Sequence, residues 1–425
     1  MSSKLDEMKK DIIKLLIAEY QQRVGNVVFQ NRPIFLEDKL NYVFVGLRRA
    51  GKSYLMYQQI HNLVEQGHSK DEILFFNFED DRLIDLETYD LDLIKVCYEE
   101  MFDFRPIFFL DEIQNVKNWE KFVRRLADQG YRVYVTGSNA KMLSSEIATT
   151  LGGRFLIQYV FPYSFPEFLI SQGIEIKEPN ALYIHQNLIN KAFQTYFQYG
   201  GFPELTQVFD KRTWLSNLYQ KIFFGDLISR YQIRNDFALR VLVRKLAESV
   251  KQPTSFNRLA NVVSASGKKI STDTVIDYIQ YLKETWLILP LENISAKLSD
   301  KESNKKYYFS DNGVLNLFLI DPVTSLLENL VAIQLMKMYP DDVYFYQKGI
   351  EVDFYVQSSK LAIQVCYSMI DVETRNREIN ALLKLSQHLE VERMMIITKE
   401  EEEIIVVSKN EIEIVPVWKW LLTSL

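Results

Sequence analysis

The sequence contains the stretch YVFVGLRRAGKS at residues 42–53. Its last eight residues, Gly46 to Ser53, fit the pattern G-x-x-x-x-G-K-[ST] of a phosphate-binding loop. The backbone N–H groups of such a loop turn inward around phosphate oxygens, and the following helix presents its positive N-terminal end to the same anion. The apolar run before the loop predicts a strand, and residues 52–65 predict a helix. The stretch therefore indicates a nucleotide-binding α/β fold.

The loop and the first turn after it supply the candidate nucleotide-binding residues. Lys52 is expected to reach the β- and γ-phosphates, and the Ser53 hydroxyl is expected to ligate Mg²⁺. ATP and Mg²⁺ are therefore the expected cofactors. A chance match is the alternative, but the strand before the loop and the helix after it argue against chance. The expected cofactor-binding residues are Gly46, Leu47, Arg48, Arg49, Ala50, Gly51, Lys52, Ser53 and Tyr54.

The first third of the chain alternates between apolar runs and helical patterns. Helical patterns at 91–101 and 118–129 separate further runs that predict strands. Because the runs are apolar on both faces, they favour a parallel sheet covered by helices on each side. The predicted strands lie at 42–46, 73–78, 107–110, 131–136 and 155–160.

Two acidic residues, Asp111 and Glu112, directly follow the third apolar run. An apolar strand that ends in two acids is what a strand-end magnesium site requires. We expect Asp111 to hold the metal, directly or through its waters, and Glu112 to polarise the attacking water. A solvated turn is the alternative for such a pair.

The fourth run ends in Thr136-Gly137-Ser138-Asn139. We expect this strand to lie beside the first strand, so that Ser138 or Asn139 orients the water or touches the γ-phosphate. Serine and asparagine are also favoured helix N-caps, so a capping role stays open.

Arg154 follows the glycine pair of Leu151-Gly152-Gly153. An arginine on such a turn is a candidate for reaching a neighbouring nucleotide and stabilising charge on the transferred phosphoryl group. A surface arginine that caps a helix end is the alternative.

The order of these motifs resembles a large family of bacterial and archaeal AAA-type P-loop ATPases. Members of this family carry a C-terminal domain of unknown function with a winged-helix part and an endonuclease-like part. The resemblance spans nearly the whole chain. It rests on GLRRAGKS (46–53), FFLDEIQ (108–114), VYVTGSN (133–139), LGGRF (151–155), FPYSFPEFL (161–169), YGGFPEL (199–205), YYFSDNGVLN (307–316), LLENLVAIQL (326–335) and EVDFYV (351–356).

The resemblance implies roles for individual residues. Lys52, Ser53, Asp111 and Glu112 would carry the nucleotide chemistry, and Arg154 would be an arginine finger. A finger that acts in trans requires a ring or a dimer, so a homo-oligomer is the implied assembly. The implied domains are an ATPase core at 1–165, a helical lid and connector at 166–235, a winged helix-turn-helix at 236–310 and a restriction-endonuclease-like domain at 311–425.

The winged-helix region gives a weak signal for DNA binding. Its expected third helix, 271–285, contains no arginine, although Lys268 and Lys269 precede it and Arg258 lies on the expected second helix. Residues 240–300 carry nine Lys and Arg against six Asp and Glu. The sequence therefore leaves open a non-specific DNA contact and a contact with a protein partner.

The endonuclease-like region lacks part of the chemistry that cleavage requires. Glu328 matches the helix acid of such a site, and Asp353 matches the strand acid, with Glu351 two residues earlier. Gln364 and Cys366 stand on the next strand where an acid and a lysine should be. Because neither can replace the missing charge, we expect no nuclease activity.

The composition is that of a globular protein without a polybasic surface. The 425 residues are 47% hydrophobic and 25% charged, with a net charge of −6. Two cysteines exclude a disulfide scaffold, and four histidines leave little for a metal site. No apolar run reaches the roughly 18–20 residues that span a bilayer, so we expect a cytoplasmic protein without membrane contact. An N-terminal packing helix is indicated by the apolar positions Leu5, Met8, Ile12, Leu15 and Leu16.

Two functions remain open at this point. The first is an ATPase that couples hydrolysis of Mg·ATP to movement of its C-terminal DNA- or protein-binding modules. The second is a slow nucleotide-gated switch or scaffold that acts through protein contacts. Residues 30–33 could flank the adenine, but no pattern selects them.

Overall fold

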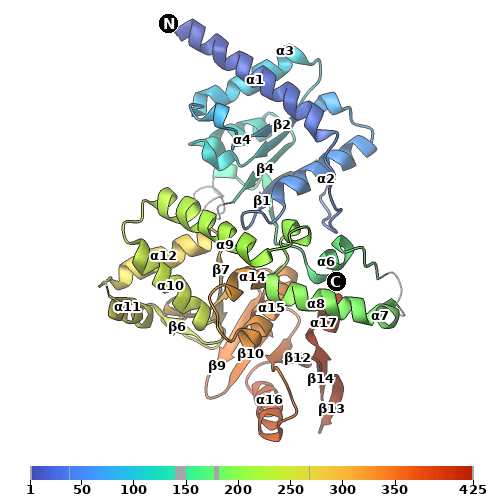
Figure 1. Ribbon diagram of the computed structural model, residues 1–425, viewed down its shortest axis with the longest axis vertical. Coiled ribbons are helices and arrows are strands. Elements are labelled where there is room, and N and C mark those ends of the chain that lie inside the picture. The colour runs from blue at the N-terminus through green and yellow to red at the C-terminus, as the bar shows by residue number, and fades with distance from the viewer. Residues whose placement is uncertain (1, 38, 139–149, 177–180, 268, 424–425) are drawn as a thin grey trace. The chain divides into compact units, whose positions relative to one another are not determined.

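The computed structural model describes residues 2–37, 39–138, 150–176, 181–267 and 269–423. The chain forms two compact units, Met1–Val160 and Phe161–Leu425, which are considered separately (Figure 1).

The first unit is built on a five-stranded sheet in the order β2-β3-β4-β1-β5, with every pair of neighbours parallel. The α/β fold expected from the sequence is thereby confirmed. β4 lies between β1 and β3, as expected, which brings the ends of these three strands to one edge. The strands are β1 (Asn41–Val45), β2 (Ile73–Asn77), β3 (Ile107–Asp111), β4 (Val133–Gly137) and β5 (Phe155–Tyr159).

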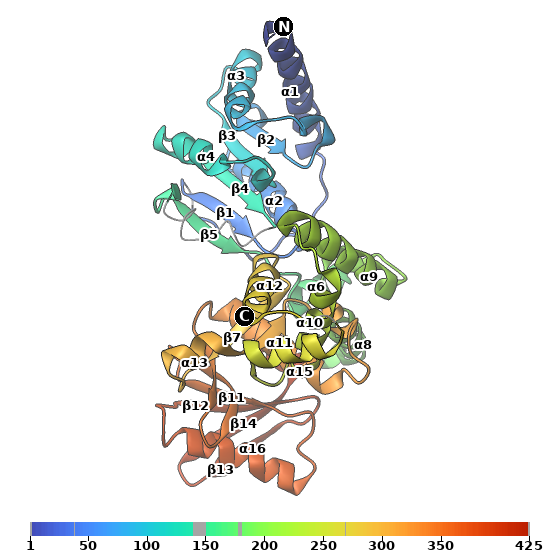
Figure 2. The same ribbon diagram turned by 90° about the vertical axis from the view of Figure 1, so that its left-hand side faces the viewer.

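Helices cover both faces of this sheet. α2 packs on one face of the sheet at β4, and α4 packs on the other face (Figures 1 and 2). The connection from β1 through α2 to β2 runs along the sheet in one direction, and the connection from β3 through α4 to β4 runs in the other. Right-handed crossovers that run in opposite directions place their helices on opposite faces. α1 packs against α3 and β2. The helices are α1 (Ser2–Val24), α2 (Lys52–Glu65), α3 (Leu91–Met101) and α4 (Trp119–Asp128).

The buried face of α1 differs from the one expected. Met8 and Leu15 are more than half exposed. Of the expected positions Leu16 does pack inward, and it does so together with Ile13, Ile17 and Tyr20, which lie three, four and seven positions apart counted from Ile13. The two faces of this helix both carry apolar residues, so periodicity alone could not choose between them.

The second unit is built on a mixed sheet in the order β13-β14-β12-β11-β10-β9-β7-β8-β6. The sequence predicted a domain boundary near residue 310, between the winged helix-turn-helix and the endonuclease-like domain. β7, before this boundary, pairs in parallel with β9, after it, so one sheet contains strands from both sides. The strands are β6 (Thr254–Ser255), β7 (Ile288–Asn293), β8 (Asn304–Phe309), β9 (Val343–Gln347), β10 (Glu351–Val356), β11 (Leu361–Val365), β12 (Arg393–Thr398), β13 (Glu403–Val407) and β14 (Asn410–Pro416).

Helices fill the remainder of this unit. α15 packs on β8 and β11, and α16 packs on β10 and β11. The helices are α6 (Phe165–Ser171), α7 (Ala181–Ile184), α8 (Gln186–Tyr199), α9 (Lys211–Lys221), the π-helix Ile222–Ser229, α10 (Asp236–Glu248), α11 (Phe256–Ala265), α12 (Thr272–Glu284), α13 (Leu298–Ser303), α14 (Asn312–Asn316), α15 (Val323–Met338), α16 (Val372–Leu385) and α17 (Val417–Thr423).

A buried carboxylate explains why two distant motifs occur together. Asp311 accepts hydrogen bonds from the backbone N–H groups of Gly201 (2.8 Å), Gly313 (2.8 Å) and Val314 (3.3 Å). A Cβ at Gly200, which has a φ of 77°, would lie 2.0 Å from an Asp311 oxygen. The GG and SDNG sequences therefore form one structural joint between α8 and α14.

Candidate nucleotide site

The phosphate loop runs from the end of β1 to the start of α2. Gly46 has a φ of 153°, and a Cβ there would lie 2.0 Å from the backbone oxygen of Val160. Gly51 also has a positive φ, 99°, directly before the helix begins. Both positions need glycine because L side chains rarely adopt such a backbone or fit such a close approach. The loop conformation thus follows from the two glycines of the motif.

The side chain of Lys52, the first residue of α2, folds back into the phosphate loop. Its Nζ donates to the carbonyls of Gly46 and Leu47, both at 3.1 Å, and lies 3.8 Å from Glu112 Oε1. The side chain is almost fully buried. The ammonium is therefore held between the phosphate loop and the acidic end of β3.

The other loop residues divide into buried and accessible ones. Leu47 and Ala50 are buried, whereas Arg49 and Tyr54 are exposed. Arg48 pairs with Glu79 at 3.0 Å. Leu47 and Ala50 can offer a ligand their backbone only, while Arg48, Arg49 and Tyr54 have side chains within reach of solvent.

Asp111 gathers hydroxyl groups from two neighbouring elements. Its Oδ1 accepts hydrogen bonds from Thr136 Oγ1 at 2.6 Å and from Ser53 Oγ at 3.0 Å. Burial, together with the charge of Glu112, raises the pKa of Asp111 to about 6. The sequence predicted Asp111 and Ser53 as partners, and the structure brings them together.

Glu112 adopts a left-handed backbone conformation, with a φ of 52°, where β3 ends. Its backbone N–H donates to Thr136 Oγ1 at 2.8 Å, and its carboxylate accepts from Gln114 Nε2. Although burial opposes it, the charge of Lys52 lowers the pKa of Glu112. The carboxylate therefore stays ionised and can accept a proton or a hydrogen bond.

The end of β4 lies next to this pair of acids. Ser138 is buried there, and its hydroxyl contributes to the lowered pKa of Glu112. Asn139 lies outside the described residues. Sequence reasoning missed Thr136 and Gln114, which hold the two acids; their places in the VYVTGSN and FFLDEIQ motifs were the available signal.

Arg154 does not lie with these residues. It comes just before β5, where Phe155 pairs with Asn41 at the start of β1. The phosphate loop leaves β1 at the other end, roughly 16 Å away along a five-residue strand. Arg154 is partly exposed, forms an ion pair with Asp128 and donates to the Gly152 carbonyl. It is therefore remote from the nucleotide site of its own chain.

The segment before β1 contacts the phosphate loop. Arg32 donates from Nη1 to the Ala50 carbonyl at 3.2 Å, and its backbone exchanges hydrogen bonds with the Gln58 amide. Arg32, within the candidate adenine-flanking segment 30–33, is thus anchored beside the loop.

The donor set fits Mg²⁺ bound together with a triphosphate. Magnesium prefers oxygen ligands and is usually held by one or two protein groups plus phosphates and waters. Ser53 and Asp111 offer such oxygens at the loop. Within the described ranges, no group of three or more His, Cys, Asp or Glu residues could hold a metal ion. Ser53 and Asp111 would thus be two of the ligands, and nucleotide phosphates and waters would supply the others.

The expected endonuclease-like residues are brought together only in part. Glu328 and Asp353 converge, but on the ammonium of Lys306, which sequence reasoning did not single out. Gln364 is buried and accepts a hydrogen bond from the Asp353 N–H at 2.8 Å. Cys366 lies in an apolar core with residues of α16 and β12.

The region expected to be a winged helix contains three helices, α10 to α12, and the β7–β8 hairpin. Ser255 caps the N-terminus of α11, and Ser271 caps the N-terminus of α12. On α12, Asp273 and Asp277 are exposed. Lys268 lies outside the described residues.

Comparisons with known proteins agree with the fold. Residues 38–169 match the family described as AAA domain, and residues 190–323 match a domain of unknown function (DUF8612). An uncharacterized protein of Methanocaldococcus jannaschii is 34% identical, and the alignment covers 100% of this chain and 97% of that protein. The chain belongs to this family of AAA-domain proteins. The resemblance expected from the motifs is confirmed.

Other relatives are more distant. An uncharacterized protein of Haemophilus influenzae is 28% identical, over 89% of this chain and 94% of its own length. The Walker-type ATPase of Pyrococcus abyssi is 13% identical, covering 69% of this chain and 99% of that one, with a TM-score of 0.42. The Orc1 protein of Aeropyrum pernix, solved in complex with DNA, is 12% identical, covering 75% and 92%, with a TM-score of 0.29. TM-scores this low carry no functional argument.

None of the helices in the described part of the chain has both the length and the apolar character needed to cross a membrane.

The raised pKa of Asp111 predicts a pH-dependent magnesium effect. Below about pH 6 the carboxyl is protonated and loses the charge that attracts Mg²⁺, whereas above it the charge is restored. We expect Mg²⁺ to strengthen binding of a fluorescent ATP analogue at pH 7.5 and to do so at least several-fold less at pH 5. Titrations with and without Mg²⁺ at both pH values measure this. An equal magnesium effect at both values would contradict it.

Proposed function

We propose that this AAA-domain protein binds and hydrolyses Mg·ATP and couples its nucleotide state to the second unit. The observation that carries the proposal is the convergence of Lys52, Asp111 and Glu112 at the phosphate loop. The ammonium of Lys52 lies within 3.8 Å of the Glu112 carboxylate, and Ser53 is hydrogen-bonded to Asp111. This combination provides a cation for the phosphates, oxygens for the metal and a base for the water.

Each residue would have a separate task in hydrolysis. The loop backbone and Lys52 would bind the β- and γ-phosphates, and Ser53 and Asp111 would hold Mg²⁺. The metal, when bound, supplies positive charge that offsets charge developing on the phosphates. Glu112, fixed by Thr136 and Gln114, would accept a hydrogen bond from the attacking water. Ser138 and Asn139 remain proposed contacts of that water or of the γ-phosphate.

Arg154 is proposed to act on a neighbouring chain. Its position at the opposite edge of the sheet keeps it from the nucleotide of its own chain. A partly exposed guanidinium on a glycine-flanked turn is well placed to reach a second subunit, where it would stabilise charge on the phosphoryl group. This proposal requires a homo-oligomer.

The nature of the coupled partner is a separate proposal. A DNA-reading helix needs donors and cations, but α12 exposes Asp273 and Asp277 and has no arginine. These charges favour a protein partner for the α10–α12 region over non-specific DNA. The alternative function is a slow nucleotide-gated switch that acts through protein contacts. It would also use a protein partner at the α10–α12 region.

The Glu112→Gln variant tests the hydrolytic role. The amide is isosteric but cannot take up a proton, so we expect ATP to bind with wild-type affinity while turnover falls by about 10²–10⁴-fold. Steady-state phosphate release and nucleotide binding, each with and without DNA, measure both effects. Unchanged turnover in this variant would remove Glu112 from the mechanism. Slow wild-type turnover with tightly retained nucleotide would favour the switch.

Mixing two inactive variants tests the action of Arg154 in trans. Arg154→Ala keeps an intact nucleotide site, and Glu112→Gln keeps the arginine. If the arginine reaches a neighbour, an equal mixture should recover about a quarter of wild-type turnover. About that share of interfaces joins a subunit that has Glu112 at the nucleotide site to a neighbour that has Arg154. A mixture of Glu112→Gln with Lys52→Ala is the control and should recover nothing. Full activity of Arg154→Ala alone would refute the role.

A further inference from the structure

Three carboxylates of the second unit converge on one buried ammonium. Lys306 Nζ lies 3.3 Å from Glu328 Oε1, 3.1 Å from Glu351 Oε1 and 3.3 Å from Asp353 Oδ1. The lysine comes from β8, Glu328 from α15 and the other two acids from β10. The Lys306 side chain has 0% exposure. The charge is therefore fully enclosed by its partners.

The surroundings hold each member of this cluster in place. Tyr308 donates its hydroxyl to Glu328 Oε1 at 2.8 Å, and the Val365 N–H donates to Asp353 Oδ2 at 2.9 Å. Although burial opposes it, the three carboxylates raise the pKa of Lys306, so the ammonium stays charged. Burial raises the pKa of Glu328 to about 7, which limits the excess negative charge.

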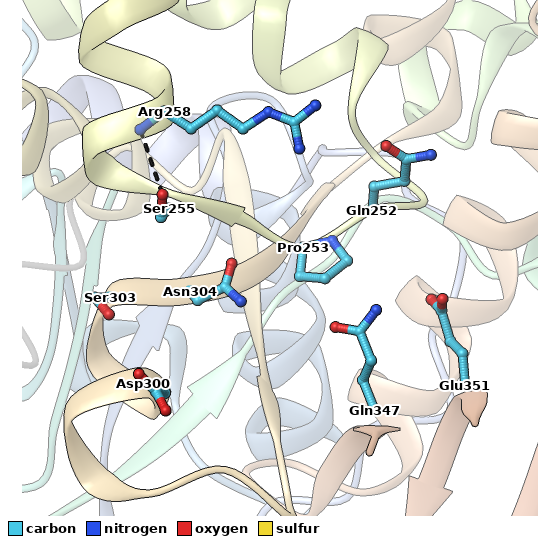
Figure 3. Close-up of a pocket in the computed structure, with 9 residues that line it drawn as sticks. All are labelled: Gln252, Pro253, Ser255, Arg258, Asp300, Ser303, Asn304, Gln347 and Glu351. Carbon is cyan, nitrogen blue, oxygen red and sulfur yellow. Dashed lines mark hydrogen bonds between the residues drawn. The ribbon is translucent and has the colours of Figure 1, made fainter. Parts of the chain in front are cut away.

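The arrangement has the form of a divalent-cation site with a lysine at its centre. Converging carboxylate oxygens from a helix and a strand are ligands that Mg²⁺ or Mn²⁺ would take. The cluster borders a cavity of about 650 Å³, lined also by Gln364, Arg377 and Lys384. A second hollow of about 580 Å³ also borders Glu351, and Figure 3 shows Glu351 and Gln347 at strand ends facing it, with Gln252 across from them. Solvent thus reaches the rim of the cluster.

The two residues of the β11 segment that stand where an endonuclease-like site needs an acid and a lysine, Gln364 and Cys366, make structural contacts instead. The Gln364 amide donates to Glu378 at 2.8 Å and to the Glu351 carbonyl at 3.3 Å, so it braces β10, β11 and α16. Cys366 donates to the Ser368 carbonyl and lies in the apolar core. Gln364 offers no negative charge to a cation and both ends of its amide are hydrogen-bonded, and the soft sulfur of Cys366 is a poor ligand for Mg²⁺.

We propose that the Lys306 ammonium permanently takes the place of a divalent cation among Glu328, Glu351 and Asp353. The cluster is then a structural ion network that binds no metal and supports no nucleic-acid cleavage. A catalytic lysine would need to contact water or substrate, whereas Lys306 is enclosed on all sides by protein. The inference concerns the second unit alone and does not depend on ATP hydrolysis.

The Lys306→Met variant tests this proposal in the full-length, nucleotide-free protein. Methionine keeps the volume of the side chain but removes the charge, which leaves three carboxylates facing one another. We expect Mn²⁺ titrations followed by electron paramagnetic resonance to show one bound ion per chain more than in wild type. The double variant with Asp353→Asn should lose the added ion. Lys305→Met is the matched control: Lys305 lies next to Lys306 on β8 but pairs with Glu292 and Glu302, so this variant should gain no site.

Several results would overturn the proposal. One is a folded Lys306→Met protein, verified by circular dichroism, that binds no more Mn²⁺ than wild type. Another is wild-type binding of Mn²⁺ that Asp353→Asn removes, which is informative even if the lysine variants, including Lys306→Gln, fail to fold. A third is Mn²⁺-dependent DNA cleavage by the wild type that Lys306→Met or Asp353→Asn abolishes. Equal Mn²⁺ binding by wild type and Asp353→Asn supports the proposal.

Discussion

The candidate nucleotide site depends on one buried carboxylate, that of Asp111. A single oxygen of this group accepts hydroxyl donors from Ser53 on α2 and Thr136 on β4. The phosphate loop, the acidic strand end and the neighbouring strand are thereby fixed to one point. Thr136 also accepts the backbone N–H of Glu112, so the same hydroxyl sets the position of the second acid. A buried charged group is tolerated only when it is paired and hydrogen-bonded, and here the pairing defines the geometry of the site.

In the second unit, buried charged groups are likewise paired or hydrogen-bonded, but by other partners. Asp311 is satisfied by three backbone N–H groups and joins α8 to α14. Lys306 is satisfied by three carboxylates and joins β8 to α15 and β10. Breaking one partner of such a buried network typically costs about 3–5 kcal/mol, because the remaining charge is left uncompensated. Acids at the positions of a nuclease-like motif can thus meet a structural requirement as well as a catalytic one.

Local sequence patterns predicted much of the fold and part of the site. The phosphate loop, the helix from Lys52 and the acids at the end of β3 could be predicted because each depends on residues close together in the chain. Lys306 could not be predicted, since its partners lie 22, 45 and 47 positions later and meet it only through the sheet order. The distance of Arg154 from the loop depends on the register between β1 and β5, which its own motif does not encode.

Calorimetric titration of the full-length protein with Mg·ATP tests the central claim most directly. The account predicts a saturable heat that corresponds to about one nucleotide per chain, and affinity at least roughly 10–100-fold weaker in Lys52→Ala, since a charged hydrogen-bonding group is removed from the phosphates. No heat from a folded wild-type protein, or equal affinity in the two proteins, would contradict it.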